Sequence, residues 1–367
     1  MSRSKRHGST NSLTVLSIVS LLLMALLILA LRYGTGRRTA DTKDHVFLYC
    51  AAGLRYPMED VVKEYKEEYG VTVEIQYGGS ATLLSQLKVA KTGDLYLAAD
   101  HSFIAKARQQ GLAEEVIPLA TMRPVMIVRK DSEKQVETLE DLLAPGLRVG
   151  LGNPDAAAIG ERVRDILEET GQWDALNAQV SDNGVFKPTV NEVANDVKLG
   201  SLDAGIVWDT TAAQYPDLRA IHVPVLDKGM SAVEITVLKS TDDATAALKF
   251  ARFLAARDRG LQVLNEMNFD VVDGDKWSEV PELVFYIGSV NRRAIEPVIK
   301  AFEAREGVQI TTDYNGCGIL TGKMKVIKEE QKGGFPDTYM ACDVYYLENV
   351  KDWFQDAVNV SDTDIVI

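Results

Sequence analysis

The sequence is poor in the residue types that most catalytic and metal sites require. It contains three cysteines and four histidines among 367 residues, and Cys50, Cys317 and Cys342 show neither C-x-x-C spacing nor a neighbouring histidine cluster. A zinc site is therefore not expected. No Ser-His-Asp or Cys-His context, G-x-S-x-G, H-E-x-x-H or Walker-type loop is present, so the sequence predicts no enzyme, no metal site and no cofactor.

Each cysteine has a simple structural interpretation. Cys50 stands in FLYCAA, a strand-like run, and is expected to be buried. Cys317, in NGCG at a predicted helix start, is interpreted as a small residue in a turn. A thiolate would be favoured at that position, so a role for the Cys317 thiol is the alternative.

Basic charge is also scarce outside the N-terminus. The formal net charge is −13, and residues 1–44 hold seven Lys/Arg and two Asp/Glu, which leaves 40 − 7 = 33 basic against 53 − 2 = 51 acidic side chains, or −18. Nucleic acid attracts basic surfaces, so it is not an expected partner. An anionic ligand would have to be held by local geometry.

Only one long apolar run occurs, in the segment 1–44. Leu13–Leu31 lacks a charged side chain, and Arg3, Lys5 and Arg6 precede it. As a helix this run would span about 28 Å, close to the hydrocarbon core of a bilayer. We expect a membrane anchor after a short cytoplasmic tip; a removed signal peptide is the alternative. In either case the remaining chain is expected in the cell envelope or periplasm, tethered to the inner membrane or secreted.

The sequence contains an internal repeat whose two copies are separated by about the length of a domain. The segment from His45 aligns without a gap with the segment from Glu282, and GDLYLAAD at 93–100 resembles PDTYMACD at 336–343. Matched pairs include Arg55 with Arg292, Tyr77 with Tyr314 and Gly79 with Gly316. The pattern predicts a complete domain at 45–277 and a partial second one, its first lobe, at 278–367.

Both segments alternate strand and helix patterns. VFLYCA, VTVEIQ and DLYLAAD are strand-like, and two amphipathic helical stretches separate them. Such alternation predicts an α/β fold with mostly parallel sheets covered on both faces. A second set of strands and helices follows the first, and SAVEITVLK is expected to return to the first lobe.

Four predicted strands end in turns that open directly into helices. These turns are AAGLRYP, YGGSAT, NPDAAAIG and PTVNEV. Ligands of open α/β sheets bind at the carboxyl ends of strands, and helix N-termini attract oxyanions. These features also have ordinary interpretations. Gly-Gly-Ser would be a turn with Ser80 as the helix cap, and Asp155 would be a second cap. Arg55 would be a surface arginine, and Trp208, at the end of a predicted strand, a core residue.

The order of these motifs resembles the molybdate-binding proteins of bacterial ABC importers. AAGL, YGGSATLLSQL, GDLYLAAD, NPDAAAIG and DAGIVWDTTA carry the resemblance over about residues 45–275. It implies a type II periplasmic-binding-protein fold, with two α/β lobes, a hinge and a cleft. It also implies a tetrahedral molybdate or tungstate ligand, held by neutral donors and delivered to an ABC permease in the membrane.

By position, the resemblance implies a set of ligand-binding residues. These are Ala52, Gly53, Gly79 and Ser80 in the first lobe, and Ala158, Ile159, Val190, Asn191 and Trp208 in the second. Two of them depart from the family, since Gly53 replaces a serine and Trp208 a tyrosine. Arg55 is not part of the family's neutral pattern, and we include it as a residue that could add affinity or favour a more highly charged oxyanion.

Other functions stay open at this point. Sulfate, phosphate or another small anion would suit the same turns, and an envelope sensor or interaction protein could use the same fold. The second segment has Asn315 and Cys317 where the first has Gly78 and Ser80, although Ser289 adds a hydroxyl nearby. It is expected to bind a related ligand or to serve as a docking lobe.

Overall fold

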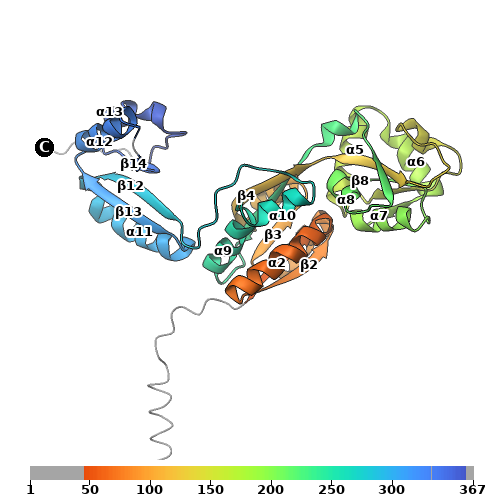
Figure 1. Cartoon of the computed structure of the whole chain (residues 1–367), viewed down its shortest axis with the longest axis horizontal. Helices are drawn as coiled ribbons and strands as arrows, with labels where there is room; N and C mark the ends of the chain where they lie inside the picture. Colours follow the sequence, from red (N-terminus) through yellow and green to blue (C-terminus); the bar gives the residue numbers. More distant parts are fainter. Residues whose placement is uncertain (1–44, 332, 361–367) are drawn as a thin grey trace, which may run out of the picture. The chain divides into compact units, whose positions relative to one another are not determined.

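The computed structural model describes residues 45–331 and 333–360 (Figure 1). The predicted membrane segment Leu13–Leu31 lies outside this part of the chain. Within it, none of the helices combines the length and apolar character that crossing a bilayer requires.

A six-stranded mixed sheet forms the first lobe. Its strands, in spatial order, are β11 (Asp270–Val271), β4 (Ala113–Met122), β10 (Ser231–Leu238), β3 (Leu95–Ala98), β1 (His45–Ala51) and β2 (Thr72–Gly78). β1 is parallel to β2 and β3, whereas β10 is antiparallel to both β3 and β4. The predicted mostly parallel sheet is therefore wrong for this half, because the SAVEITVLK strand returns in the opposite direction.

A five-stranded mixed sheet forms the second lobe. Its strands, in spatial order, are β7 (Val185–Lys187), β6 (Val149–Gly152), β8 (Ala204–Trp208), β5 (Pro124–Arg129) and β9 (Leu218–Ile221). β6 is parallel to β7 and β8, and β5 is antiparallel to β8 and β9. The chain enters this lobe through Arg123, between β4 and β5, and leaves it through Met230, just before β10.

Helices follow the strands in both lobes. The first lobe contains η1 (Ala52–Leu54), α2 (Arg55–Tyr69), α3 (Ser80–Ala90), α4 (His101–Gln109), α9 (Ala244–Leu254) and α10 (Gly260–Glu266). The second contains η2 (Glu140–Leu143), α5 (Ala158–Glu169), α6 (Trp173–Asn183), α7 (Val190–Lys198), α8 (Asp209–Ala213) and η3 (Leu226–Gly229).

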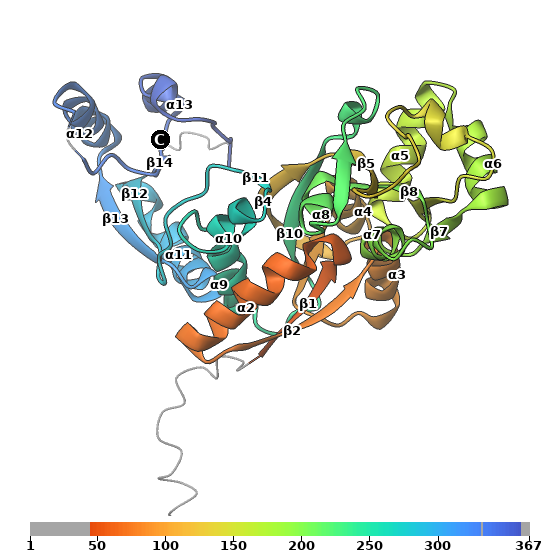
Figure 2. The same cartoon turned by 45° about the vertical axis from the view of Figure 1, so that its right-hand side comes forward.

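The apolar face that the sequence periodicity of α2 predicts packs against α9. Its apolar residues Met58, Val61 and Tyr65 are buried, and the ring of Tyr65 lies 5.0 Å from the rings of both Phe250 and Phe253 on α9. α2 and α9 are neighbours in Figures 1 and 2. Edge-on aromatic contacts of this kind add to the stabilisation from apolar burial.

A third, three-stranded sheet follows at the C-terminal side. Its strands, in spatial order, are β13 (Gln309–Asn315), β12 (Glu282–Gly288) and β14 (Thr338–Met340). Its helices are η4 (Ser289–Asn291), α11 (Arg292–Glu306), α12 (Cys317–Glu329), α13 (Val344–Glu348) and η5 (Lys351–Trp353). The order of elements matches β1 to α4, and the register matches too, since β1 pairs His45 with Thr72 and β12 pairs Glu282 with Gln309.

Helix ends agree with the same correspondence. Gly70 ends α2 and Gly307 ends α11, each in the left-handed conformation with φ of 72° and 63°. Glycine adopts this conformation without the cost that a side chain would impose. These glycines therefore end equivalent helices in the same way.

The third sheet differs from the first in how much it buries. Val298 and Phe302 on α11 are 58% and 45% exposed, whereas Val61 and Tyr65, at the equivalent places on α2, are buried. The separate apolar cluster of this segment consists of Tyr286, Leu320, Met324 and Val350. Within the described residues, Phe302 therefore lacks the aromatic contacts that Phe250 and Phe253 make with Tyr65.

The cysteines follow two different patterns. Cys50 is fully buried in β1, which confirms the expectation. Cys317 and Cys342 form a disulfide, so the interpretation of Cys317 as merely a small residue in a turn is wrong, and so is the alternative of a reactive thiol. Their separation of 25 residues did not indicate the pair, because only the fold brings the start of α12 beside the end of β14.

Candidate functional site

The carboxyl ends of strands from both lobes meet at one small cavity of about 20 Å³. Its lining comes from the turns after β1, β2, β3, β6, β7 and β8, and consists of Ala51, Ala52, Gly53, Gly78, Gly79, Ser80, Ala99, Ala157, Ala158, Ile159, Thr189, Val190 and Trp208. A cavity of this size suits one small ion and not a drug-sized organic molecule.

Ser80 is the principal polar side chain that the first lobe contributes. It is 1% exposed, and its Oγ accepts the Ala99 N–H at 3.2 Å. Tyr96 Oη donates to the Ser80 carbonyl at 2.8 Å and fixes the turn. Gly79, not Ser80, is the N-cap of α3, and the cap makes no side-chain hydrogen bond, so the capping interpretation of Ser80 is wrong.

The hydroxyl hydrogen of Ser80 remains available. Its oxygen already accepts a bond, and within the described ranges no acceptor is recorded for the hydroxyl itself. The first N–H groups of a helix also lack an intrahelical acceptor. In α3 the N–H groups of Ala81 and Thr82 find an acceptor in the other lobe, the Ala156 carbonyl, so this helix start presents the Ser80 hydroxyl at the cavity.

The second lobe contributes two further helix starts. Ala158 and Ile159 begin α5, and Val190 begins α7. Thr189 caps α7: its Oγ1 accepts the Glu192 N–H at 3.4 Å and donates to Glu192 Oε1 at 2.8 Å. This cap satisfies the Glu192 N–H, while the N–H groups of Val190 and Asn191 before it have no intrahelical acceptor.

The two lobes touch directly at Gly79. The N–H groups of Ala81 and Thr82 donate to the Ala156 carbonyl at 3.1 and 3.3 Å. A Cβ on Gly79 would lie 2.3 Å from the Ala156 oxygen and 2.6 Å from the Pro188 oxygen. Only glycine permits this approach, so the structure is a closed one in which β2 and α3 contact the second lobe.

A buried ion pair links the two lobes beside the cavity. Asp100 is 2% exposed and caps α4 through the Ser102 N–H at 2.8 Å. It also accepts Ser231 Oγ at 2.5 Å and the guanidinium of Arg162 from α5 in the other lobe. Burial alone would raise the pKa of Asp100, but the bonds from Ser231, Ser102 and Arg162 outweigh it and lower that pKa.

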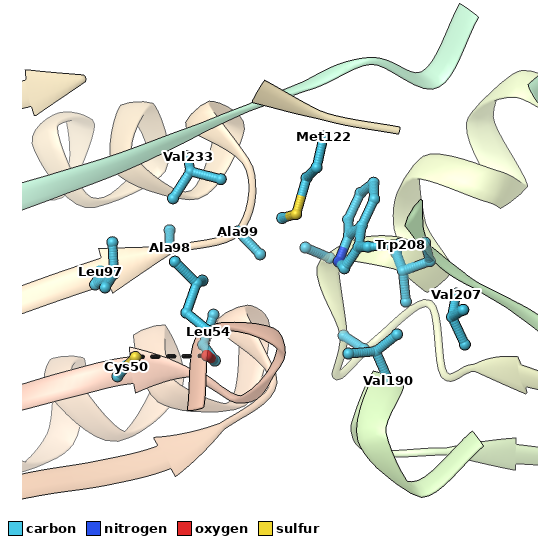
Figure 3. Packing of buried hydrophobic residues seen from close by; sticks show 14 of the residues in the cluster. Cys50, Leu54, Leu97, Ala98, Ala99, Met122, Val190, Val207, Trp208 and Val233 are labelled. Carbon is cyan, nitrogen blue, oxygen red and sulfur yellow. Dashed lines mark hydrogen bonds between the residues drawn. The ribbon is translucent and has the colours of Figure 1, made fainter. Parts of the chain in front are cut away.

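Trp208 lies at the interlobe side of the cavity. Figure 3 shows its indole reaching from the second lobe to the side of Met122 and Ala99. It is 1% exposed, and a Cβ on Gly53 would lie 3.4 Å from Trp208 Cδ1 and 3.3 Å from Val190 Cγ1. The absence of a side chain at Gly53 thus leaves space for the Trp208 indole. The two positions that depart from the family pattern, Gly53 and Trp208, are therefore in contact.

Two predicted site residues do not line the cavity. Arg55 stacks on the Tyr77 ring at 4.2 Å and lies 3.8 Å from Glu59, and Arg292 repeats this arrangement with Tyr314 at 4.9 Å and Glu296 at 3.7 Å. The recurrence of Arg55 therefore reflects a shared stacking contact. Asn191 lies one residue beyond the lining, with its Oδ1 buried and without a partner among the described atoms.

The remaining predicted residues all line the cavity. These are Ala52, Gly53, Gly79, Ser80, Ala158, Ile159, Val190 and Trp208. The sequence reasoning missed Ala51, Gly78, Ala99, Ala157 and Thr189, which also line it. Ala99 follows β3, so applying the strand-end rule to GDLYLAAD as well would have found it.

The cavity wall is electrically neutral at the level of side chains. Every lining residue is uncharged, and positive potential comes from the starts of α3, α5 and α7. In the described ranges, no group of three or more His, Cys, Asp or Glu side chains is placed to hold a metal ion. The arrangement suits an anion held by hydrogen bonds and helix dipoles.

Comparison with known proteins identifies the family. The model of the bacterial extracellular solute-binding proteins matches residues 46–266. This chain belongs to that family. Membership confirms the expectation of a solute-binding protein and not an enzyme, and it agrees with the expected location outside the cytoplasm.

Relatives of this solute-binding protein include two bacterial examples. A "putative binding protein" of Haemophilus influenzae is 30% identical over 172 residues, which cover 47% of this chain and 69% of the relative. The molybdate-binding protein ModA of Mycobacterium tuberculosis is 25% identical over 228 residues, or 61% of this chain and 84% of the relative.

Solved structures share the fold at lower identity. The periplasmic molybdate-binding protein of Azotobacter vinelandii superposes with a TM-score of 0.54 at 18% identity, covering 62% of this chain and 100% of that one. The sulfate-binding protein SubI of Mycobacterium tuberculosis gives 0.54 at 17% identity, covering 76% and 98%. These likenesses support a periplasmic-binding-protein-like α/β fold and leave the ligand open.

Proposed function

We propose that this solute-binding protein captures one tetrahedral oxyanion, molybdate or tungstate in the first place, in the cavity between its lobes. The observation that carries the proposal is the convergence of three helix starts and the Ser80 hydroxyl on a cavity of about 20 Å³ that no charged side chain lines. A cavity without a charged side chain binds a fully ionised anion through fixed dipoles and hydrogen bonds. The resemblance to molybdate-binding proteins supports the choice of ion.

Sulfate and phosphate are the alternative ligands. The fold is shared with a sulfate-binding protein, so the architecture alone does not choose among tetrahedral anions. Trp208 and Gly53 change the wall relative to the molybdate-binding pattern, and these two positions are where we expect ligand choice to be set.

We assign the chain to the type II arrangement of this fold and infer that it delivers its ion to an ABC permease in the same membrane. The apolar segment Leu13–Leu31 would tether it there. The order and register shared by β1 to α4 and β12 to α13 support a partial second copy of the first lobe at 278–367. An envelope sensor with the same anchored domain is the second candidate, which the extra segment favours.

Calorimetry tests the ligand. The full chain, purified in mild detergent, is titrated with molybdate, tungstate, sulfate and phosphate in turn. We expect binding of molybdate or tungstate and weaker or no binding of the other two. Tight binding of sulfate or phosphate would assign the alternative ligand, and a folded sample that gives no heat with any of the four would exclude the oxyanion function.

A further inference from the structure

The disulfide of the C-terminal segment lies where the first lobe has its principal ligand donor. Ser80 begins α3 after Gly79, and Ala99 follows β3. In the C-terminal segment Cys317 begins α12 after Gly316, and Cys342 follows β14. Each pair therefore joins the start of one helix to the end of the third strand of its unit.

The same hydrogen bond recurs in both pairs. The Ala99 N–H donates to Ser80 Oγ at 3.2 Å, and the Cys342 N–H donates to Cys317 Sγ at 3.3 Å. The second pair is in addition linked through its sulfur atoms. A hydroxyl that is free to donate to an ion is thus replaced by a sulfur that is bonded to its neighbour.

The sulfur atoms also lie against the strand end that forms the cavity wall in the first lobe. A Cβ on Gly288 would lie 2.8 Å from Cys317 Sγ and 3.1 Å from Cys342 Sγ. By register, Gly288 takes the place of Ala51, which lines the cavity together with Ser80 and Ala99. The disulfide therefore occupies the room that the ion site of the first lobe leaves open.

A covalent link has a clear structural use in this segment. The apolar cluster here is small. Val298 and Phe302 on α11 are exposed, whereas the equivalent residues on α2 are buried. Small cores of exported proteins commonly depend on disulfides, because burial alone stabilises them too little. Cys50, by contrast, is buried in the large core of the first lobe and has no partner sulfur.

We propose that the donor pair of the second unit is converted into a structural disulfide: Cys317–Cys342 staples α12 to β14, and residues 278–367 bind no oxyanion. The disulfide staple does not depend on the proposed function, whereas the expected count of one ion per chain rests on it. In forming the bond, the two thiols lose two protons and two electrons to a disulfide oxidant such as oxidised glutathione. That oxidant is reduced to two thiols.

Thiol labelling and proteolysis of the full chain test the staple. When the chain is denatured and treated with iodoacetamide, the oxidised form is expected to be labelled at Cys50 alone. The reduced form is expected to be labelled at all three cysteines. Reduction is expected to speed limited proteolysis within 278–360 by about tenfold or more, with cleavage within 45–277 unchanged. Three labelled cysteines in the chain purified without reductant, or unchanged proteolysis after reduction, would overturn the staple.

Two variants show whether reductant acts through the Cys317–Cys342 disulfide or through Cys50. Cys317→Ser with Cys342→Ala recreates the Ser80 and Ala99 pair, so it should be cleaved in 278–360 as readily as the reduced chain and should not respond to reductant. Cys50→Ala should keep the response of the parent chain.

Calorimetry with molybdate supplies the count of ions. One ion per oxidised chain agrees with the proposal, and two would overturn it. No binding of any anion would count against the proposed function, and the staple would then be decided by labelling and proteolysis.

Discussion

At the scale of single residues, the Ser80 hydroxyl is the donor on which the proposed oxyanion site depends most directly. Its oxygen is engaged by the Ala99 N–H at 3.2 Å, which orients the side chain and leaves the hydrogen for a ligand. Ser80→Ala should weaken oxyanion binding by about 1–3 kcal/mol, because a bond to a charged oxygen is lost. Calorimetry measures the change, with the exposed Ser85→Ala on the same helix as the matched control. Equal affinity of Ser80→Ala and the parent chain would show that the hydroxyl does not contact the ion.

The buried carboxylate of Asp100 makes folding sensitive to acid. Its pKa is lowered in the folded chain, so its stabilising contribution is complete above the usual aspartate value of about 3.9 and is lost as pH falls through the lower, folded pKa. Urea unfolding at a series of pH values should show this loss below about pH 4. Asp100→Asn should flatten that part of the profile. Parallel profiles for Asp100→Asn and the parent chain would contradict the assignment.

Residues differed in how well the sequence predicted them. Gly79 and Ser80 were found because a turn between a strand and a helix has one location, at the strand's carboxyl end. Arg55 stands in a similar turn, but the direction of a long side chain depends on its neighbours. Here the Arg55 guanidinium stacks on the Tyr77 ring and pairs with Glu59, and it does not line the cavity.

At the scale of elements, the turn between β2 and α3 controls contact between the lobes. Gly79→Ala would place a Cβ 2.3 Å from the Ala156 oxygen and force the lobes apart. We expect at least about a tenfold loss of oxyanion affinity, because overlap with backbone costs about 1–3 kcal/mol and the contacts of closure are lost. The folded chain should keep its melting temperature in the absence of ligand.

Gly316→Ala is the matched control for this element. Gly316 precedes α12 as Gly79 precedes α3, but the nearest atom to its added Cβ is Ile319 Cδ1 at 3.9 Å. It should leave affinity unchanged in calorimetry. Equal losses in both variants would mean that the effect of Gly79→Ala arises from the helix start and not from contact between lobes.

Strand direction was the element property that the sequence could not supply. Alternating strands and helices predicted the parallel group β1, β2 and β3 correctly, since each short crossover contains a helix. β4 and β10 are joined through the whole second lobe, so no local pattern specified that β10 would lie antiparallel between β3 and β4.

At the scale of the whole molecule, two crossings near Arg123 and Met230 are the covalent links between the lobes of the solute-binding domain. Two such links permit a hinge motion, while the Ala156 carbonyl and the pair of Asp100 with Arg162 hold the closed form. A ligand that contacts both lobes stabilises this form by its difference in affinity between the open and closed states. Small-angle scattering should therefore show a smaller radius of gyration when the full chain is saturated with the oxyanion proposed for it. Gly79→Ala, which cannot close fully, should compact less at saturating ligand, and an identical radius with and without ligand in the parent chain would rule out closure as the response to binding.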